Sequence, residues 1–166
     1  MSHRSQILFR EGELSVLTYK HWGGFPETVI PLLRDYWQWC PRRYIKYLVS
    51  TWFYYCKRKM EDEIRDEKYI EPDSSPVETT EIEDFYPVAQ NYGICADGSL
   101  NWDTEHLYVV DIDEERVSHY TPVDDFLFKT DSLDETTART PDKTYPLAME
   151  ESNQRCVESK QGGKYE

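Results

Sequence analysis

The alternation of apolar and polar residues at the start of the chain predicts a β-hairpin. Ile7 and Phe9 lie two positions apart, and residues 14–18 alternate again after the turn Glu11-Gly12-Glu13. A period of two on either side of a glycine-containing turn is typical of two antiparallel strands. The hairpin is expected to end at Trp22-Gly23-Gly24-Phe25-Pro26, where two glycines and a proline interrupt regular structure.

Two helices are predicted next, because apolar residues recur there at intervals of three and four. The first spans residues 27–39 and is stopped by Pro41. Thr28 is its expected N-cap, which places Pro31 in the first turn, where a proline is tolerated. The second spans residues 43–66 and becomes polar toward its end. Each helix has one apolar stripe, and that stripe must lie against the sheet.

The remainder of the chain is predicted to hold less regular structure. Residues 67–84 are acidic, contain two prolines and show no period, which indicates an exposed loop. Short strands are expected at 94–96, 107–112 and 116–120. The strand at 107–112 is expected to be buried and to form a second hairpin with the strand at 116–120. Residues 129–166 are rich in Thr, Asp, Glu and Ser and are expected to be a mostly disordered acidic tail, with a short ordered segment at 145–149.

The order of these elements predicts an α+β fold with the order β-β-α-α-β-β-β. Strands and helices do not alternate as they do in parallel sheets, so an antiparallel sheet of about four to five strands is expected, with two helices packed on one face. The expected boundaries are a single domain at 1–128 and the tail at 129–166.

Composition excludes several classes of protein. No run approaches the roughly 18 to 20 apolar residues of a membrane span, and residues 1–10 carry charges where a signal peptide has its apolar segment. We therefore expect a cytoplasmic protein with no membrane contact. The four cysteines show no CxxC spacing and are expected to be reduced, Cys40 and Cys56 as core residues. No pattern indicates a metal site, a cofactor or a catalytic motif.

His21, Trp22, Gly23 and Gly24 form the most distinctive short segment, which leads from the predicted hairpin into the first helix. Glycines permit close backbone approach, and free N–H groups at a helix start favour an anion, so a small-molecule or hydrolytic site around His21 is one hypothesis. The alternative is structural: the two rings pack under the helix and the glycines make the turn.

The opening hairpin followed by Tyr-Lys-His-Trp-Gly-Gly-Phe-Pro resembles a group of uncharacterised small proteins from phages and prokaryotes. In that group the second strand ends in a His-Trp-Asp-Gly-Tyr-Pro type of sequence before a helix. Gly23 stands where that pattern tends to have Asp, which removes a carboxylate that could act with His21. The resemblance covers the first quarter of the chain; it implies the order of elements and a phage or prokaryotic origin, and it implies no activity.

The second predicted helix combines aromatic and basic residues. Arg42, Arg43 and Lys46 precede or begin it, a second basic cluster follows at 57–59, and tyrosines and tryptophan lie between them. Cations neutralise phosphates and aromatic faces stack on bases, so this helix is a candidate surface for single-stranded nucleic acid. The alternative is that the aromatic stripe is core and the basic residues form its solvated flank.

The charge distribution favours a third kind of function. Residues 1–60 carry ten Lys or Arg and four Asp or Glu, which gives this part a net charge of +6. Because the formal net charge of the whole chain is −13, residues 61–166 carry a net charge of −19. Acidic clusters, including Asp111 and Asp113 on one face of a predicted strand, could imitate a nucleic-acid backbone and bind a basic protein partner. A non-enzymatic interaction protein of this kind is the leading hypothesis from sequence. Solvated loops and a solubilising tail are the alternative.

Overall fold

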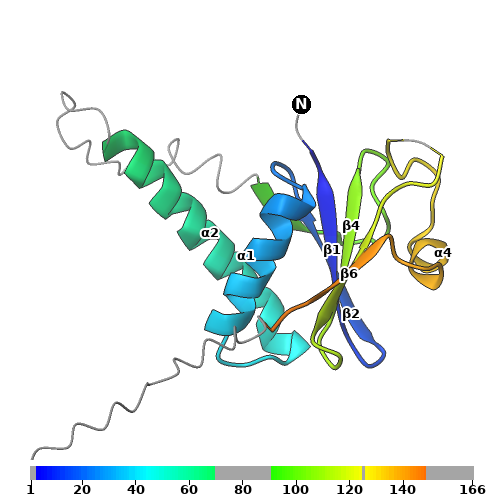
Figure 1. The fold of residues 1–166 in the computed structure, drawn as a ribbon, viewed down its shortest axis with the longest axis horizontal. Coiled ribbons are helices and arrows are strands. Elements are labelled where there is room, and N and C mark those ends of the chain that lie inside the picture. The colour runs from blue at the N-terminus through cyan, green and yellow to red at the C-terminus, as the bar shows by residue number, and fades with distance from the viewer. Residues whose placement is uncertain (1–2, 70–90, 125, 149–166) are drawn as a thin grey trace, which may run out of the picture.

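The computed structural model describes residues 3–69, 91–124 and 126–148, which form an α+β fold with one mixed sheet (Figure 1). The strands are β1 (Ser5–Glu11), β2 (Leu14–Lys20), β3 (Tyr92–Ile94), β4 (His106–Asp111), β5 (Arg116–Tyr120) and β6 (Lys143–Pro146). The helices are α1 (Pro26–Trp39), α2 (Ile45–Tyr69) and α4 (Leu133–Ala138). The strand order across the sheet is β3-β2-β1-β4-β5-β6, and both predicted hairpins and both long helices are present.

The two central strands, β1 and β4, run parallel, whereas every other neighbouring pair is antiparallel. The prediction of an antiparallel sheet with four to five strands is therefore wrong in this pair and in the number of strands. All four residues from Leu107 to Val110 are buried, a continuous apolar run that is typical of a strand covered on both faces. For this reason β4 lies in the centre beside β1 rather than at an edge.

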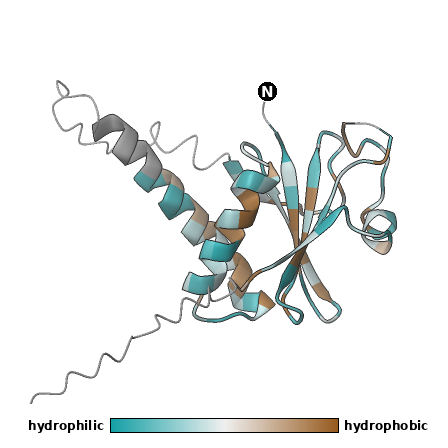
Figure 2. Cartoon of the chain, in the orientation of Figure 1, coloured by the Kyte–Doolittle hydropathy of each residue, from teal (hydrophilic) through white to brown (hydrophobic). Residues whose placement is uncertain are grey.

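Helices α1 and α2 cover one face of the sheet, as predicted. Their apolar residues gather on the side that faces the strands, where Trp37, Trp52 and Leu48 pack with Ile7 and Phe9 of β1 in one buried cluster (Figure 2). Cys40 and Cys56 are buried in the same cluster as free thiols, as predicted. None of the helices in the described part of the chain has an apolar stretch of the length that a bilayer crossing requires.

The start of α1 differs from the prediction. Phe25 is the N-cap residue and Pro26 the first helical residue, whereas Thr28 lies inside the first turn and its backbone N–H donates to the Phe25 carbonyl at 3.0 Å. Proline suits this first position because its fixed φ matches the helix and no N–H is lost. Pro31 consequently lies inside the helix, beyond the first turn in which it was predicted.

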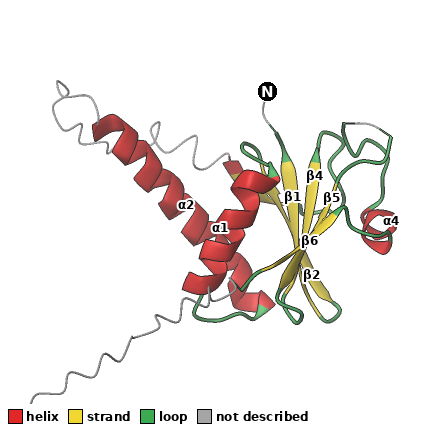
Figure 3. Cartoon of the chain, in the orientation of Figure 1, coloured by secondary structure: helices red, strands yellow, loops and turns green. Residues whose placement is uncertain are grey.

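The opposite face of the sheet has a second apolar cluster. Leu8, Leu17 and Phe128 are buried there, and Leu133 of α4 packs against them. Figure 3 shows α4 on the other side of the sheet from α1 and α2. Loops and one short helix cover this face.

The prediction of a mostly disordered tail from residue 129 is wrong for residues 129–148. Ser132 caps α4, where its hydroxyl accepts from the Glu135 N–H at 3.1 Å. Strand β6 pairs with β5, and the completely buried Leu147 reaches the core between sheet and helices. The expectation of a short ordered segment beginning at Tyr145 is thus close to the observed strand. Residues 149–166 and most of the predicted acidic loop at 67–84 lie outside the described residues.

Candidate functional site

The segment between β2 and α1 is held tightly against the start of β1. The Gly24 N–H donates to the His3 carbonyl at 2.8 Å, and the buried hydroxyl of Tyr108 donates to the Gly24 carbonyl at 2.7 Å. A Cβ atom added to Gly24 would lie 2.6 Å from the His3 carbonyl oxygen. Gly23 has a φ of +65°, which glycine adopts without strain. Both glycines therefore have a structural role in this turn.

The rings of His21 and Trp22 contact each other edge to face, with centroids 4.7 Å apart. The Tyr19 hydroxyl lies 2.8 Å from Nδ1 of His21, and the Trp22 N–H donates to Oδ1 of Asn91 at 2.7 Å. Partial burial, together with the nearby positive charge of Arg4, lowers the pKa of His21. The ring is therefore neutral near pH 7 and is oriented by an aromatic partner. The hypothesis of a small-molecule or hydrolytic site at His21 stays a prediction.

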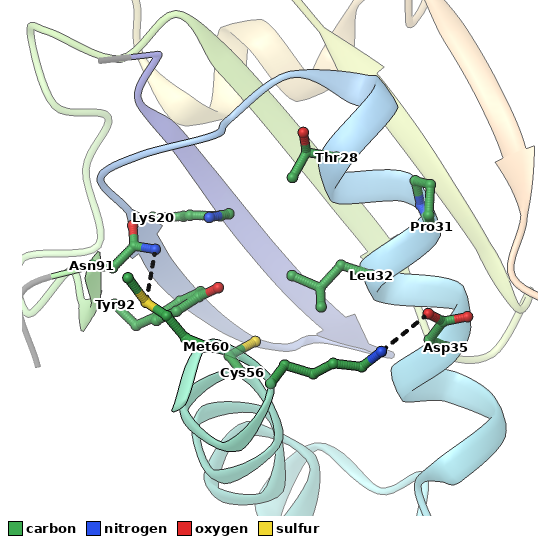
Figure 4. A pocket seen from close by; sticks show the side chains of 10 residues that line it. Lys20, Thr28, Pro31, Leu32, Asp35, Cys56, Met60, Asn91 and Tyr92 are labelled. Atoms are coloured by element: carbon green, nitrogen blue, oxygen red, sulfur yellow. Dashed lines mark hydrogen bonds and ion pairs between the residues drawn. The ribbon is translucent and has the colours of Figure 1, made fainter. Parts of the chain in front are cut away.

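A cavity of about 260 Å³ lies beside this segment, between α1, α2 and the β2–β3 edge of the sheet (Figure 4). Lys20 of β2 lines it and is only 4% exposed. Its ammonium group donates to the Trp22 carbonyl and lies 5.0 Å from the ring centroid of Tyr92. Those contacts compensate the cost of burying a cation. His21 is not among the lining residues of this cavity.

Helices α1 and α2 supply most of the remaining cavity wall, including one thiol, and Asn91 and Tyr92 complete it. Cys56 is completely buried, and this burial raises the pKa of its thiol far above the ordinary value. Nζ of Lys59, another residue that lines the cavity, lies 3.7 Å from a carboxylate oxygen of Asp35. Because nucleophilic catalysis requires a thiolate, Cys56 in this setting is a packing residue.

An exposed surface that we call the aromatic-basic face covers the end of α1, the connection between α1 and α2, and the outer side of α2. Its four aromatic residues are between 39% and 60% exposed: Trp39, Tyr44, Tyr47 and Tyr54. Its four basic residues are all exposed: Arg42, Lys46, Lys57 and Arg58. Trp52, in contrast, is completely buried. The helix therefore carries two separate aromatic groups, one in the core and one in solvent.

The cations of this surface differ in their partners. Arg43 is tied to the fold: one amino group donates to the Trp37 carbonyl at 3.0 Å, the other lies 3.4 Å from Glu115, and the guanidinium lies over the Trp37 ring. Arg42 and Lys46 both lie over the exposed ring of Tyr47. Among the described residues, the four cations of the aromatic-basic face form no ion pair with a carboxylate. Arg42 and Lys46 of the predicted site therefore belong to this face, and Arg43 serves to hold it.

Asp111 and Asp113 lie at the turn between β4 and β5 and bind backbone groups. Asp111 accepts from the Glu114 N–H at 2.9 Å, and Asp113 accepts from the Gly12 N–H at 2.8 Å. The second bond joins the two hairpin turns across the parallel pair of strands. Such side-chain bonds to backbone N–H groups are typical of turn stabilisation.

The sequence interpretation missed a cluster of histidines at the other end of the sheet. Ligand atoms of His3, Glu105 and His106 all lie within 4.8 Å of one another. Nδ1 of His106 lies 3.0 Å from Nε2 of the buried His119. Burial, followed by the neighbouring His106, lowers the pKa of His119 to about 4, and burial also lowers the pKa of His106. Both rings are therefore neutral at pH 7.

The parallel pairing of β1 with β4 brings these residues together. It places Ser5 opposite His106, so residues 3 and 4 lie beside residues 105 and 106. No local spacing in the sequence encodes this contact. Only a prediction of the parallel pair could have revealed it.

Comparison of the chain with protein-family models, with curated proteins and with solved structures gives no match. The resemblance to small phage and prokaryotic proteins therefore stays a prediction.

Proposed function

We propose that this protein binds single-stranded nucleic acid through its aromatic-basic face. The observation that carries the proposal is the concentration of exposed aromatic rings and exposed cations on this one surface. Proteins that hold single strands without sequence preference combine the same two components, because cations track the phosphates while rings stack on bases.

The helix places these groups at suitable intervals. Tyr47, Tyr54 and Arg58 are separated by seven and four residues, so they lie on one face of α2. A rise of about 1.5 Å per residue puts Tyr47 and Tyr54 about 10 Å apart along the axis, which a strand of a few nucleotides can span. Trp39 stacks on Tyr54 with ring centroids 6.2 Å apart and extends the surface onto α1. Stacking requires unpaired bases, which favours single strands over duplex.

The local charge favours a polyanion although the whole chain is acidic. Residues 41–60 contain six Lys or Arg and no Asp or Glu, whereas the formal net charge of the chain is −13. Screening in salt restricts the repulsion from distant carboxylates to about 10 Å at 0.1 M. We therefore expect binding that weakens as salt rises, since each neutralised phosphate releases counterions.

Fluorescence anisotropy with a labelled single-stranded oligonucleotide, in DNA and RNA form, tests the proposal at low salt. Tyr47→Ala and Tyr54→Ala should each weaken binding by roughly 5- to 150-fold, the range for losing one base-aromatic stack. Arg58→Gln should reduce the slope of log affinity against log salt by about 0.7.

Trp102→Ala is the matched control, because Trp102 is a 68% exposed aromatic residue outside this face. The Trp102→Ala variant should bind the oligonucleotide with the same affinity as the unaltered protein. An absence of binding at low salt would refute the proposal, and so would equal losses in Trp102→Ala and Tyr54→Ala.

A second candidate function is binding of a basic protein partner through acidic loops, as the overall charge favours. The turns at the ends of two hairpins lie side by side because Gly12 donates to Asp113, and they bring Glu13 and Glu114 to one end of the sheet. The experiment tests whether the chain captures a basic protein. This candidate is supported if capture is lost at high salt and is also lost in a Glu13→Gln, Glu114→Gln double variant. Capture that is independent of salt would rule it out.

A further inference from the structure

Three of the four histidines of this chain lie at one end of the sheet, around the start of β1, β4 and α1. We propose that His3, Glu105 and His106 form a binding site for a divalent transition-metal ion. Imidazole nitrogen and carboxylate oxygen are a ligand set that Zn²⁺ accepts readily. This site is separate from the aromatic-basic face and does not depend on nucleic-acid binding.

The distances between the donor groups fit one ion. The three ligand atoms lie within 4.8 Å of one another, and Nδ1 of His3 is 2.7 Å from Oε2 of Glu105. Donors in tetrahedral zinc sites lie about 2.0 to 2.2 Å from the ion, and therefore about 3.3 Å from each other. The observed separations exceed that value by at most about 1.5 Å, so ion binding requires the side chains to close by no more than this distance.

The backbone holds these residues together without a metal. The N–H groups of Glu105 and His106 both donate to the Arg4 carbonyl, at 3.0 and 3.3 Å. The Gly24 N–H fixes the His3 carbonyl, and the His3 ring lies against Phe25 with centroids 3.7 Å apart. Because the polypeptide is already ordered, the cost of assembling the ligands is small.

His119 acts as a positioning residue for His106. Its Nε2 lies 3.0 Å from Nδ1 of His106, and its ring stacks on Tyr108 with centroids 4.9 Å apart. Such a contact fixes the orientation and tautomer of a ligand ring, as the outer partners of metal-bound histidines do.

Solvent can reach the proposed ligands. The side chains of His3 and Glu105 are 29% and 22% exposed, so the cluster borders solvent, although Nδ1 of His3 is itself covered. Three protein ligands leave a fourth position for water, in contrast with the four protein ligands of most structural zinc sites. The arrangement therefore suits an accessible ion rather than one sealed inside the fold.

Titration of the full, tag-free chain with Zn²⁺ against a chromophoric chelator tests the site. The unaltered protein should bind one ion at this site, and His3→Gln and Glu105→Gln should each lower the affinity at least tenfold. His21→Gln is the matched control, because it removes the one histidine outside the cluster and should leave the affinity unchanged. Urea unfolding of each metal-free variant checks that the fold is retained.

Co²⁺ provides a second measurement on the unaltered protein. Binding at the proposed site should give visible d–d bands of low symmetry without a cobalt-thiolate charge-transfer band, since all ligands are nitrogen or oxygen. A thiolate band, the absence of saturable binding, or equal affinities in the unaltered protein and in Glu105→Gln would each overturn the proposal.

Discussion

Replacement of Gly24 by alanine tests how closely the segment before α1 lies against β1. The added Cβ would lie 2.6 Å from the His3 carbonyl oxygen and 3.0 Å from both the Arg4 carbonyl carbon and the Ser5 Cβ. Two of these three neighbours are backbone atoms, so rotation of a side chain cannot relieve the contact. Gly24→Ala must therefore move either the segment or the start of β1.

The expected loss of stability follows from three contributions. Forcing a methyl group into a packed contact costs about 1 to 3 kcal/mol. Displacement also weakens the hydrogen bonds that Gly24 makes with His3 and Tyr108, each worth about 0.5 to 1.5 kcal/mol. Alanine also lowers the conformational entropy of the unfolded chain, which stabilises the folded state by about 0.4 to 1 kcal/mol. We expect the free energy of unfolding to fall by about 1 to 5 kcal/mol.

Urea unfolding followed by tryptophan fluorescence and circular dichroism measures this change, provided that both probes give one transition. Gly93→Ala is the matched control, because no atom lies within 4 Å of its added Cβ and its φ is not positive. Its stability should change by no more than about 0.5 kcal/mol. Equal effects of the two substitutions, or a loss below about 0.5 kcal/mol in Gly24→Ala, would refute the reasoning.

Three further predictions concern buried polar groups. Tyr36→Phe should lower the free energy of unfolding by about 1 to 2 kcal/mol, because the Tyr36 hydroxyl donates to the Leu48 carbonyl at 2.6 Å inside the core; an unchanged urea midpoint would contradict this. Gln6→Met should cost about 3 kcal/mol and increase amide hydrogen exchange in residues 95–104, since the completely buried Gln6 makes four hydrogen bonds with that segment. Cys56 should resist alkylation at pH 8 in the native protein, because burial raises the pKa of its thiol, and it should react once the protein is unfolded in urea. Peptide mass spectrometry measures the labelling. Rapid labelling of the native protein would contradict this prediction and would show that the helices open.

Local periodicity was enough to predict most of the elements. The period of two predicts the hairpin β1–β2. Apolar residues at intervals of three and four predict both long helices and their packing on one face of the sheet. The exposed tyrosines could also have been separated from the core. Leu48, Trp52 and Cys56 recur every four residues and are buried, whereas Tyr47 and Tyr54 fall on another side of the same helix.

Long-range pairing could not be predicted in the same way. The sequence of β4 indicated a buried strand but not its neighbour in the sheet, so neither its central position nor the nearby histidine cluster was foreseen. Strand β6 was hidden for a different reason: none of its four residues is buried, and the completely buried Leu147 follows the strand. Its place is set by pairing with β5 and by the Arg34 side chain, which donates to the Pro146 carbonyl.

The parallel pair at the centre of the sheet also sets the order in which the chain can fold during synthesis. One side of β1 has no strand to pair with until β4 has left the ribosome, because Ser5 pairs with His106, about a hundred residues later in the chain. Until then β1 is an unprotected edge whose apolar residues are open to pairing with other chains. The high contact order of this pairing should make closure of the sheet the slow step. Nascent chains that stop before β4 should therefore depend on chaperones, whereas chains that have completed β4 should not.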